Sequence, residues 1–294
     1  MSHYRGLSLG SKLKPKLIRY LKGTIPEPLL GFLPRGYAKI GHVMIVNIPE
    51  ILKNYEVEIA EILLKMGAFS GIKTVAKKAG RTKGIYRMPQ IKVLAGEKQT
   101  ETLHRENDTM FKLDPARITF SPGNHNERKR MIDIANNYET IVDLFACVGN
   151  LSLPIAVHKN VIIYAIEKNP EAYKYLLENI KINKLENRVI PLFGDNRDVT
   201  PKNVADRVIM GYLYPTIDQL EIGIKALKNI KGGWIHFHIA KPLNKLKEPE
   251  TLVKKVANKL EYDVCYIKKL RVKHYAPSIE HLVLDVNLKP RTTI

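Results

Sequence analysis

The chain has 294 residues, enough for two domains with cores of their own. Its 48 lysines and arginines outnumber 29 acidic residues, a formal net charge of +19 that favours a polyanionic partner, with nucleic acid first and a membrane surface second. No apolar run could span a membrane, no signal-peptide pattern opens the chain, and the two cysteines fit neither a disulfide framework nor a zinc site. We therefore expect a cytoplasmic protein without membrane association or metal.

Residues 1–30 form a basic extension in which lysines and arginines alternate with leucines and isoleucines. The pattern fits a short amphipathic helix that contacts a phosphate backbone, and it fits a solvated terminal segment equally well. Pro26, Pro28 and Pro34 end any helix there.

A small α+β domain is expected over residues 31–122. His42–Asn47 has the pattern of a strand and Tyr55–Met66 that of a helix. Short strand-like pieces follow at Gln90–Leu94, Thr100–Leu103, Met110–Leu113 and Arg117–Phe120.

Residues 71–87 of this domain combine glycines with basic residues and predict a flexible loop suited to nucleic-acid phosphates. A solvated turn is the alternative, but charges of a single sign favour the binding interpretation. The candidate contacts are Lys77, Lys78, Arg81 and Arg87.

The stretch Ser121–Arg130, S-P-G-N-H-N-E-R-K-R, leads into the second domain, expected over residues 123–294. A turn precedes a helix predicted over Asn126–Asn136, whose N-terminus would lie near a ligand pocket. Helix capping with surface charge is the alternative interpretation. The side chains that would face the pocket are Ser121, Glu127 and Arg128.

Ile141–Asn150, I-V-D-L-F-A-C-V-G-N, has the pattern of a buried strand, an acid and a tight turn, and a helix is predicted over Leu151–His158. Small side chains at Ala146 and Gly149 would let a ligand approach the backbone. Only Gly149 remains of the usual glycine-rich motif, so this stretch alone fits an ordinary strand–helix turn equally well.

The following strands favour a nucleotide site. Val161–Ile166 is a second buried strand that ends in Glu167, where a carboxylate accepts from both ribose hydroxyls. A third strand, Val189–Phe193, is followed by Asp195 and Asn196, and a fourth is predicted over Arg207–Met210.

The remaining elements distinguish between nucleotide folds. A helix begins at Thr216 with a capping box and reaches Asn229, and a fifth strand covers Trp234–Ile239. The last helix and two closing antiparallel strands are predicted at Glu248–Leu260, Tyr262–Lys268 and His281–Leu288. Five strands alternating with helices and a closing antiparallel pair predict an α/β, Rossmann-like class I S-adenosylmethionine-dependent transferase rather than a nicotinamide dehydrogenase. In that fold Asp195 would accept from the adenine amino group.

Residues from about 31 to 294 resemble the family of the archaeal and eukaryotic tRNA guanosine-37 methyltransferases and the related wybutosine-synthesis aminocarboxypropyltransferases. The motifs that carry the resemblance are Phe120–Arg130, Asp143–Asn150, Glu167–Pro170, Gly194–Asp198 and Arg271–Pro277. The resemblance implies S-adenosylmethionine as donor, without metal, and tRNA as the polyanionic partner, bound by a monomer. The implied donor-binding set is Ser121, Arg128, Asp143, Ala146, Gly149, Asn150, Glu167, Asp195 and Asn196.

Departures from the methyltransferase pattern point to the other branch. Gly123 and Asn124 stand where that branch has Arg-Leu, Cys147 replaces a glycine, and a Gly211-x-x-x-Pro215 form replaces its Asn-Leu-Pro motif. The resemblance then implies transfer of the 3-amino-3-carboxypropyl group to the tricyclic base at position 37 of tRNA(Phe), with methylthioadenosine released. Glu127 aligns with the proposed general base of methyl transfer. The alternatives are guanine-37 methylation and a non-catalytic tRNA-binding module.

Overall fold

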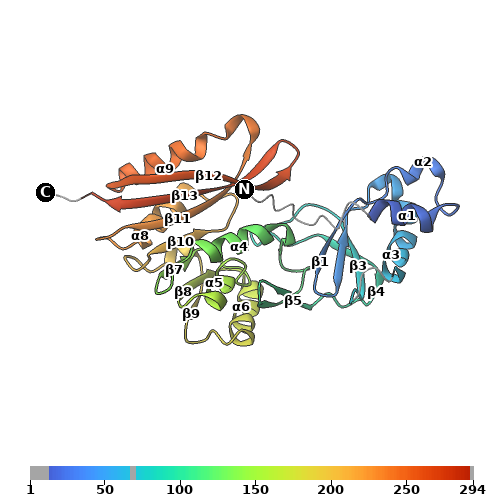
Figure 1. Cartoon of the computed structure of the whole chain (residues 1–294), viewed down its shortest axis with the longest axis horizontal. Coiled ribbons are helices and arrows are strands. Elements are labelled where there is room, and N and C mark those ends of the chain that lie inside the picture. Colours follow the sequence, from blue (N-terminus) through green and yellow to red (C-terminus); the bar gives the residue numbers. More distant parts are fainter. Residues whose placement is uncertain (1–12, 67–70, 292–294) are drawn as a thin grey trace. The chain divides into compact units, whose positions relative to one another are not determined.

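The computed structural model describes residues 13–66 and 71–291, which divide into two compact units (Figure 1). The small unit contains the residues up to Arg105 and Lys112–Pro122, and the large unit contains Glu106–Phe111 and the residues from Gly123 onward. Along the described ranges, every helix is too short or too polar to cross a membrane.

The small unit is built on a four-stranded sheet in the order β1-β2-β3-β4, in which β2 and β3 are parallel and the outer pairs antiparallel. Its strands are β1 Tyr37–Ile40, β2 Val43–Val46, β3 Thr74–Lys78 and β4 Ile91–Gly96. Its helices are α1 Leu13–Leu21, α2 Glu27–Leu30, the 3-10 helix η2 Glu50–Tyr55 and α3 Glu56–Lys65.

Helix α1 decides between the two interpretations of the basic N-terminal segment in favour of an amphipathic helix, whereas its contact with a phosphate backbone stays a prediction. Leu13, Leu17 and Leu21 recur every fourth residue and are fully buried, in one apolar cluster with residues of β2 and α3. The described part of the predicted extension therefore contributes to the core of the small unit.

Two predictions in this unit were wrong. Residues 71–87 are not one flexible loop, because Thr74–Lys78 forms β3, whose Thr74, Val75 and Ala76 are buried in the middle of the sheet. This apolar run is too short to stand out among the flanking lysines. Arg117–Phe120 is not a strand, because Arg117 and Ile118 belong to a turn in which Asp114 accepts from the backbone N–H groups of Ala116, Arg117 and Ile118.

A separate two-stranded sheet follows, formed by β5 Thr102–Glu106 and β6 Thr109–Leu113. The tip of this hairpin belongs to the large unit. There Asn183 donates to the Met110 carbonyl at 2.8 Å and accepts from its N–H at 2.9 Å, and His158 Nε2 lies 2.9 Å from the Asn107 carbonyl.

The large unit confirms the predicted fold class. Its seven strands have the order β12-β13-β11-β10-β7-β8-β9, parallel from β11 to β9 and antiparallel at β13 and β12. They are β7 Thr140–Asp143, β8 Ile162–Glu167, β9 Val189–Phe193, β10 Arg207–Met210, β11 Gly233–Pro242, β12 Tyr262–Ala276 and β13 Ile279–Pro290.

Helices cover both faces of this sheet (Figure 1). Ile141 and Ile209 pack in a cluster with α4, α5 and α6, whereas their neighbours Val142 and Val208 pack on the opposite face in a cluster with α8 and α9. This alternation is the pattern of a strand buried on both sides. The helices are α4 His125–Ile134, α5 Ser152–His158, α6 Pro170–Ile182, α7 Asn196–Val199, α8 Ile217–Ala226 and α9 Glu248–Lys259, with the 3-10 segments η3 Pro122–Asn124 and η4 Leu243–Lys245.

Strand β7 occupies the position where the strand order reverses, since the chain continues outward to β8 and β9 on one side and returns to β10 and β11 on the other. In such sheets ligands bind outside the carboxyl ends of the strands at this switch point. Asp143 ends β7 and Glu167 ends β8.

The closing antiparallel pair is confirmed, but the strands are longer than predicted. Residues 271–276, expected in the connection, continue β12, and the turn lies at Pro277 and Ser278, where Ser278 has φ 60°. The capping box of α8 is also confirmed, with Thr216 and Gln219 bound reciprocally, although α8 ends at Ala226.

Candidate active site

The turn after β7 depends on one glycine. Gly149 has φ +90°, and a Cβ added there would lie 2.2 Å from Cγ of Leu153. Cys147 also has a positive φ, of 54°, a conformation that favours glycine. The N–H groups of Gly149 and Asn150 both donate to the Ala146 carbonyl, at 2.8 and 3.1 Å, and close the turn.

Glu167, at the end of β8, is fixed beside this turn. Its Oε2 accepts from the Cys147 N–H at 2.8 Å and its Oε1 from the Asn169 N–H at 2.7 Å. Burial raises the pKa of this carboxyl. Each carboxylate oxygen has two acceptor sites, so both retain a site for a further donor such as a ribose hydroxyl.

Two buried acceptor atoms near the turn, Asp143 Oδ2 and Asn150 Oδ1, make no hydrogen bond of standard geometry among the described residues, although the buried Ser152 hydroxyl interacts with the Asp143 carboxyl. The other oxygen of Asp143 accepts from the Phe145 N–H at 3.1 Å, and burial raises the pKa of Asp143 to about 6. Unpaired buried acceptors are costly, so both atoms fit a ligand that brings N–H or O–H donors.

Asp195 and Asn196, after β9, have different roles. Asp195 accepts from the N–H and Nη2 of Arg197, at 3.0 and 2.8 Å, and lies 3.4 Å from Lys168 Nζ. The hydrogen bond from Arg197 holds the pKa of this carboxyl well below its usual range. Asn196 instead donates to the Leu144 carbonyl at 3.0 Å and accepts from Gln219 at 3.4 Å. Its amide braces the loop, so we do not retain it as a donor-binding side chain.

The contacts of Arg128 on α4 do not support the donor-binding role predicted for this residue. Its side chain is 1% exposed, and its fork binds Glu106, with Nη2 to Oε2 at 2.8 Å and a second bond from Nε to Oε1. The guanidinium therefore fixes the tip of the β5–β6 hairpin. Ser121 belongs to the small unit, and its contact with the donor stays a prediction.

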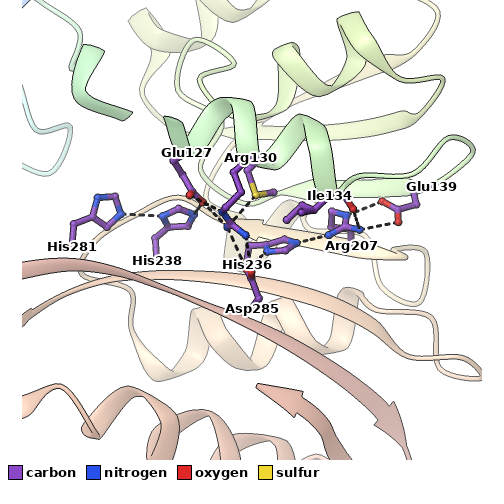
Figure 2. Close-up of polar contacts among 10 residues, drawn as sticks. Glu127, Arg130, Ile134, Glu139, Arg207, His236, His238, His281 and Asp285 are labelled. Carbon is purple, nitrogen blue, oxygen red and sulfur yellow. Dashed lines mark hydrogen bonds and ion pairs between the residues drawn. The ribbon is translucent and has the colours of Figure 1, made fainter. Parts of the chain in front are cut away.

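Glu127, the predicted general base, is bound by an arginine that the sequence did not single out (Figure 2). Arg130 donates from Nε to Oε2 at 2.8 Å and from Nη2 to Oε1 at 2.7 Å. His238 Nε2 lies 3.5 Å from the same Oε1. Glu127 is buried, with 5% of its surface exposed.

A network of buried and half-buried polar residues continues from Arg130 between α4 and the sheet (Figure 2). In β11 the apolar Ile235 and Phe237 face the α8–α9 cluster, and the intervening His236 and His238 face α4. The two histidines spaced by one residue in an apolar strand were the sequence signal for this network. Its further members are Glu139, Arg207, His281 and Asp285.

The basic candidates of the small unit are not equivalent. Lys78 and Arg81 are exposed, whereas Lys77 is 13% exposed and bound to Glu56, which also accepts from Lys92 at 2.7 Å. Arg87 has φ 53°, and its carbonyl accepts from Thr119 Oγ1 at 2.8 Å. Contact of these residues with tRNA stays a prediction.

Comparison with known proteins gives matches along nearly the whole chain. Residues 102–265 match the TRM5/TYW2 methyltransferase domain, and residues 17–100 match the TYW2 N-terminal domain. The tRNA(Phe) (4-demethylwyosine(37)-C(7)) aminocarboxypropyltransferase of Pyrococcus horikoshii is 38% identical over 277 residues, which cover 94% of this chain and 97% of the relative.

Two further matches are informative: one is a solved structure, and the other is a relative with methyltransferase activity. The crystal structure of P. horikoshii TYW2 in complex with MeSAdo has a TM-score of 0.82 and 36% identity, and the match covers 95% of this chain and 100% of that one. The tRNA (guanine(37)-N(1))-methyltransferase Trm5b of Pyrococcus abyssi is 36% identical over 89% of this chain and 77% of its own length. The chain therefore belongs to the TRM5/TYW2 family.

Proposed function

We propose that this chain transfers the 3-amino-3-carboxypropyl group of S-adenosylmethionine to the tricyclic wyosine-precursor base at position 37 of tRNA(Phe) and releases methylthioadenosine. The match of residues 17–100 to the TYW2 N-terminal domain carries this proposal. The P. horikoshii aminocarboxypropyltransferase, similar over 94% of the chain, supports the same branch. The net charge of +19 suits a tRNA substrate, and we place the enzyme in the cytoplasm as a monomer.

Guanine-37 methylation is the second candidate, because the P. abyssi methyltransferase is 36% identical to this chain. The Gly123-Asn124 pair, where that branch has Arg-Leu, speaks against it. Asn124 precedes α4, and its buried Oδ1 has no partner among the described residues. An unpaired acceptor at this departure from the methyltransferase pattern is consistent with a different ligand group beside it.

The geometry of the switch point supports a set of donor-binding assignments. We assign Glu167 to the ribose hydroxyls, because both of its oxygens keep an acceptor site, and Asp195 to the adenine amino group. Asp143 Oδ2 and Asn150 Oδ1 are buried acceptors without a hydrogen bond of standard geometry among the described residues, and they suit the amine of the transferred group. Ala146 and Gly149 would leave room for the donor at the turn.

The reaction exchanges one carbon–sulfur bond for one carbon–carbon bond. A ring carbon of the base attacks the methylene carbon attached to the sulfonium, and the electron pair of the breaking bond stays on sulfur. The sulfonium becomes the neutral thioether of methylthioadenosine. The ring carbon then loses its proton, and we propose Glu127 as the carboxylate that receives it. Proximity and orientation supply most of the remaining barrier reduction, on the order of 7–11 kcal/mol.

Labelled donors test which group moves. S-adenosylmethionine carrying a label in its carboxyl carbon should pass the label to tRNA(Phe) that contains the tricyclic precursor, and donor labelled in the methyl carbon should not. The nucleoside product should contain the label at position 37, and chromatography should identify the second product as methylthioadenosine.

Unmodified tRNA(Phe) is the matched control, because its guanine lacks the tricyclic ring carbon. Transfer of the methyl label to this control, with adenosylhomocysteine as product, would establish the methyltransferase activity instead. Absence of transfer to either tRNA would favour a non-catalytic binding module.

A further inference from the structure

The guanidinium group of Arg130 binds Glu127 and is itself bound by a residue of the sheet. Besides its two bonds to Glu127, Arg130 donates from Nη1 to Asp285 Oδ2 at 2.6 Å and from Nη2 to Asp285 Oδ1 at 3.2 Å. Arg130 thus lies between two carboxylates, one from α4 and one from β13 (Figure 2). A fork that binds two carboxylates in its plane has little freedom to rotate.

Asp285 is fixed in turn by His236, and the protonation of this histidine follows from its neighbours. Arg207 Nη1 lies 2.5 Å from His236 Nε2, and an arginine has only donors, so Nε2 must accept. His236 Nδ1 therefore carries the proton and donates to Asp285 Oδ1 at 2.6 Å. Burial lowers the pKa of His236, in keeping with this neutral form.

The far end of the network returns to α4. Arg207 binds both oxygens of Glu139, at 2.7 and 2.9 Å, and donates from Nη2 to the carbonyl of Ile134 at 2.9 Å. Ile134 is the last residue of α4, and Glu127 lies in its first turn. Residues of β10, β11 and β13 therefore fix both ends of the helix that carries Glu127.

We propose that Arg130 is a positioning residue that fixes the carboxylate of Glu127 for the transfer step, and that Asp285 and His236 act through Arg130. This inference rests on the proposed function, in which Glu127 receives the proton of the attacked ring carbon. A buried ionic network contributes little net stability compared with apolar packing. Its geometry does remove the rotamer freedom of a glutamate at the start of a helix, and a displacement of about 1 Å costs a catalyst about 100-fold in rate.

A double-mutant cycle on kcat tests the proposal. Arg130→Lys keeps the positive charge but loses the fork, and we expect kcat for methylthioadenosine release to fall about 100-fold, with KM for tRNA and the affinity for S-adenosylmethionine nearly unchanged. Glu127→Gln should lower kcat on the order of 10²–10⁴-fold. The double variant should be no slower than Glu127→Gln alone, because Arg130 acts only through Glu127.

The matched control is Arg291→Lys. Arg291 also binds a carboxylate and an amide, with Asp263 at 2.8 Å and Asn258 at 2.9 Å, and belongs to the same unit. The Arg291→Lys substitution should leave kcat unchanged. Additive losses in the cycle, or an Arg130→Lys enzyme as fast as wild type, would overturn the proposal.

Asp285→Asn keeps the test decisive if Arg130→Lys does not fold. It removes the charge opposite Arg130, and we expect a loss of kcat that likewise disappears in the Glu127→Gln background. A loss that persists there would overturn the inference. Failure of the proposed function is recognised separately, because wild-type enzyme would then release no methylthioadenosine.

Discussion

At the scale of single residues, Glu167 has two roles, in the turn after β7 and in ligand binding, of which the sequence indicated only the second. Its carboxylate accepts from the N–H of Cys147, which has a positive φ, and so stabilises the turn, and it keeps acceptor sites for a ligand. Glu167 therefore shapes the site and binds within it. The burial that raises its pKa also strengthens every hydrogen bond it makes.

Glu167→Ala should weaken S-adenosylmethionine binding about 10- to 100-fold, since hydrogen bonds to a charged group are worth roughly 1.5–3 kcal/mol. Glu167→Gln keeps an acceptor oxygen and the size of the side chain, and should lose less affinity. Titration calorimetry on the folded variants measures both. An unchanged affinity in Glu167→Ala would remove this residue from the donor site.

At the scale of elements, β11 and β13 turn alternate residues toward the α8–α9 cluster, where they are apolar, and toward α4, where several of them are polar. His238 and His281 lie on the α4 side, with 3.0 Å between His238 Nδ1 and His281 Nε2. Burial is the main cause that lowers the pKa of each to about 3. His238 Nε2 faces Glu127, and His236, Arg130 and Asp285 are the nearby titratable groups that act on His238.

This pair predicts how stability depends on pH. An unfolded histidine binds a proton below about pH 6.5, whereas the folded pair stays neutral until near pH 3, so stability present above about 6.5 is lost as the pH falls. Each histidine should contribute a slope of about 1.4 kcal/mol per pH unit between about pH 4 and 6.

Urea unfolding of wild type, His238→Gln and His281→Gln across this pH range measures the slope. Each substitution should reduce the slope by about 1.4 kcal/mol per pH unit, the contribution of one proton, whatever its effect on stability at pH 7. Identical slopes in the three proteins would show that these histidines do not stay neutral in the folded state.

Among the basic residues at 77–81 of the small unit, we expect some to bind tRNA and one to stabilise the fold. Lys78→Ala with Arg81→Ala should lower tRNA affinity and reduce the slope of log affinity against log salt by roughly 0.7–0.9 for each phosphate that is no longer neutralised. Lys77→Ala should instead lower thermal stability, because Glu56 is 6% exposed and would keep only Lys92. Filter binding at several salt concentrations and thermal melting distinguish the effects. An unaltered salt slope in the double variant would place the tRNA elsewhere.

At the scale of the whole molecule, the sequence predicted the features that short stretches of chain determine, and it did not predict contacts between distant residues. The runs ending in Asp143 and Glu167 have buried residues and a terminal acid within one strand, so the fold and the donor-binding edge could be read from them. The pairs Arg128–Glu106 and Lys77–Glu56 join residues 22 and 21 positions apart, and Arg130–Asp285 joins residues 155 positions apart. Spacing in a single sequence does not encode such pairs, so Arg128 and Lys77 were assigned to ligands instead of to carboxylates of the chain.

The pair Arg128–Glu106 also bears on where the catalytic unit begins. We predicted residues 123–294, but Glu106–Phe111 belongs to the large unit, and without it Arg128 would be a buried charge lacking its carboxylate. A fragment of residues 102–294 should unfold cooperatively and bind S-adenosylmethionine. A fragment of residues 123–294 should be less stable by about 3–5 kcal/mol, the cost of removing one partner from a buried pair.

Arg128→Met in the shorter fragment is the decisive control, because an apolar side chain of similar length removes the buried charge that has lost Glu106. Chemical denaturation of the three fragments should show that this substitution recovers most of the missing stability, by up to several kcal/mol. A shorter fragment as stable as the longer one would mean that the hairpin tip adds nothing to the unit. If Arg128→Met recovered nothing, the loss would come from other interactions of the tip, such as the two bonds between Asn183 and Met110.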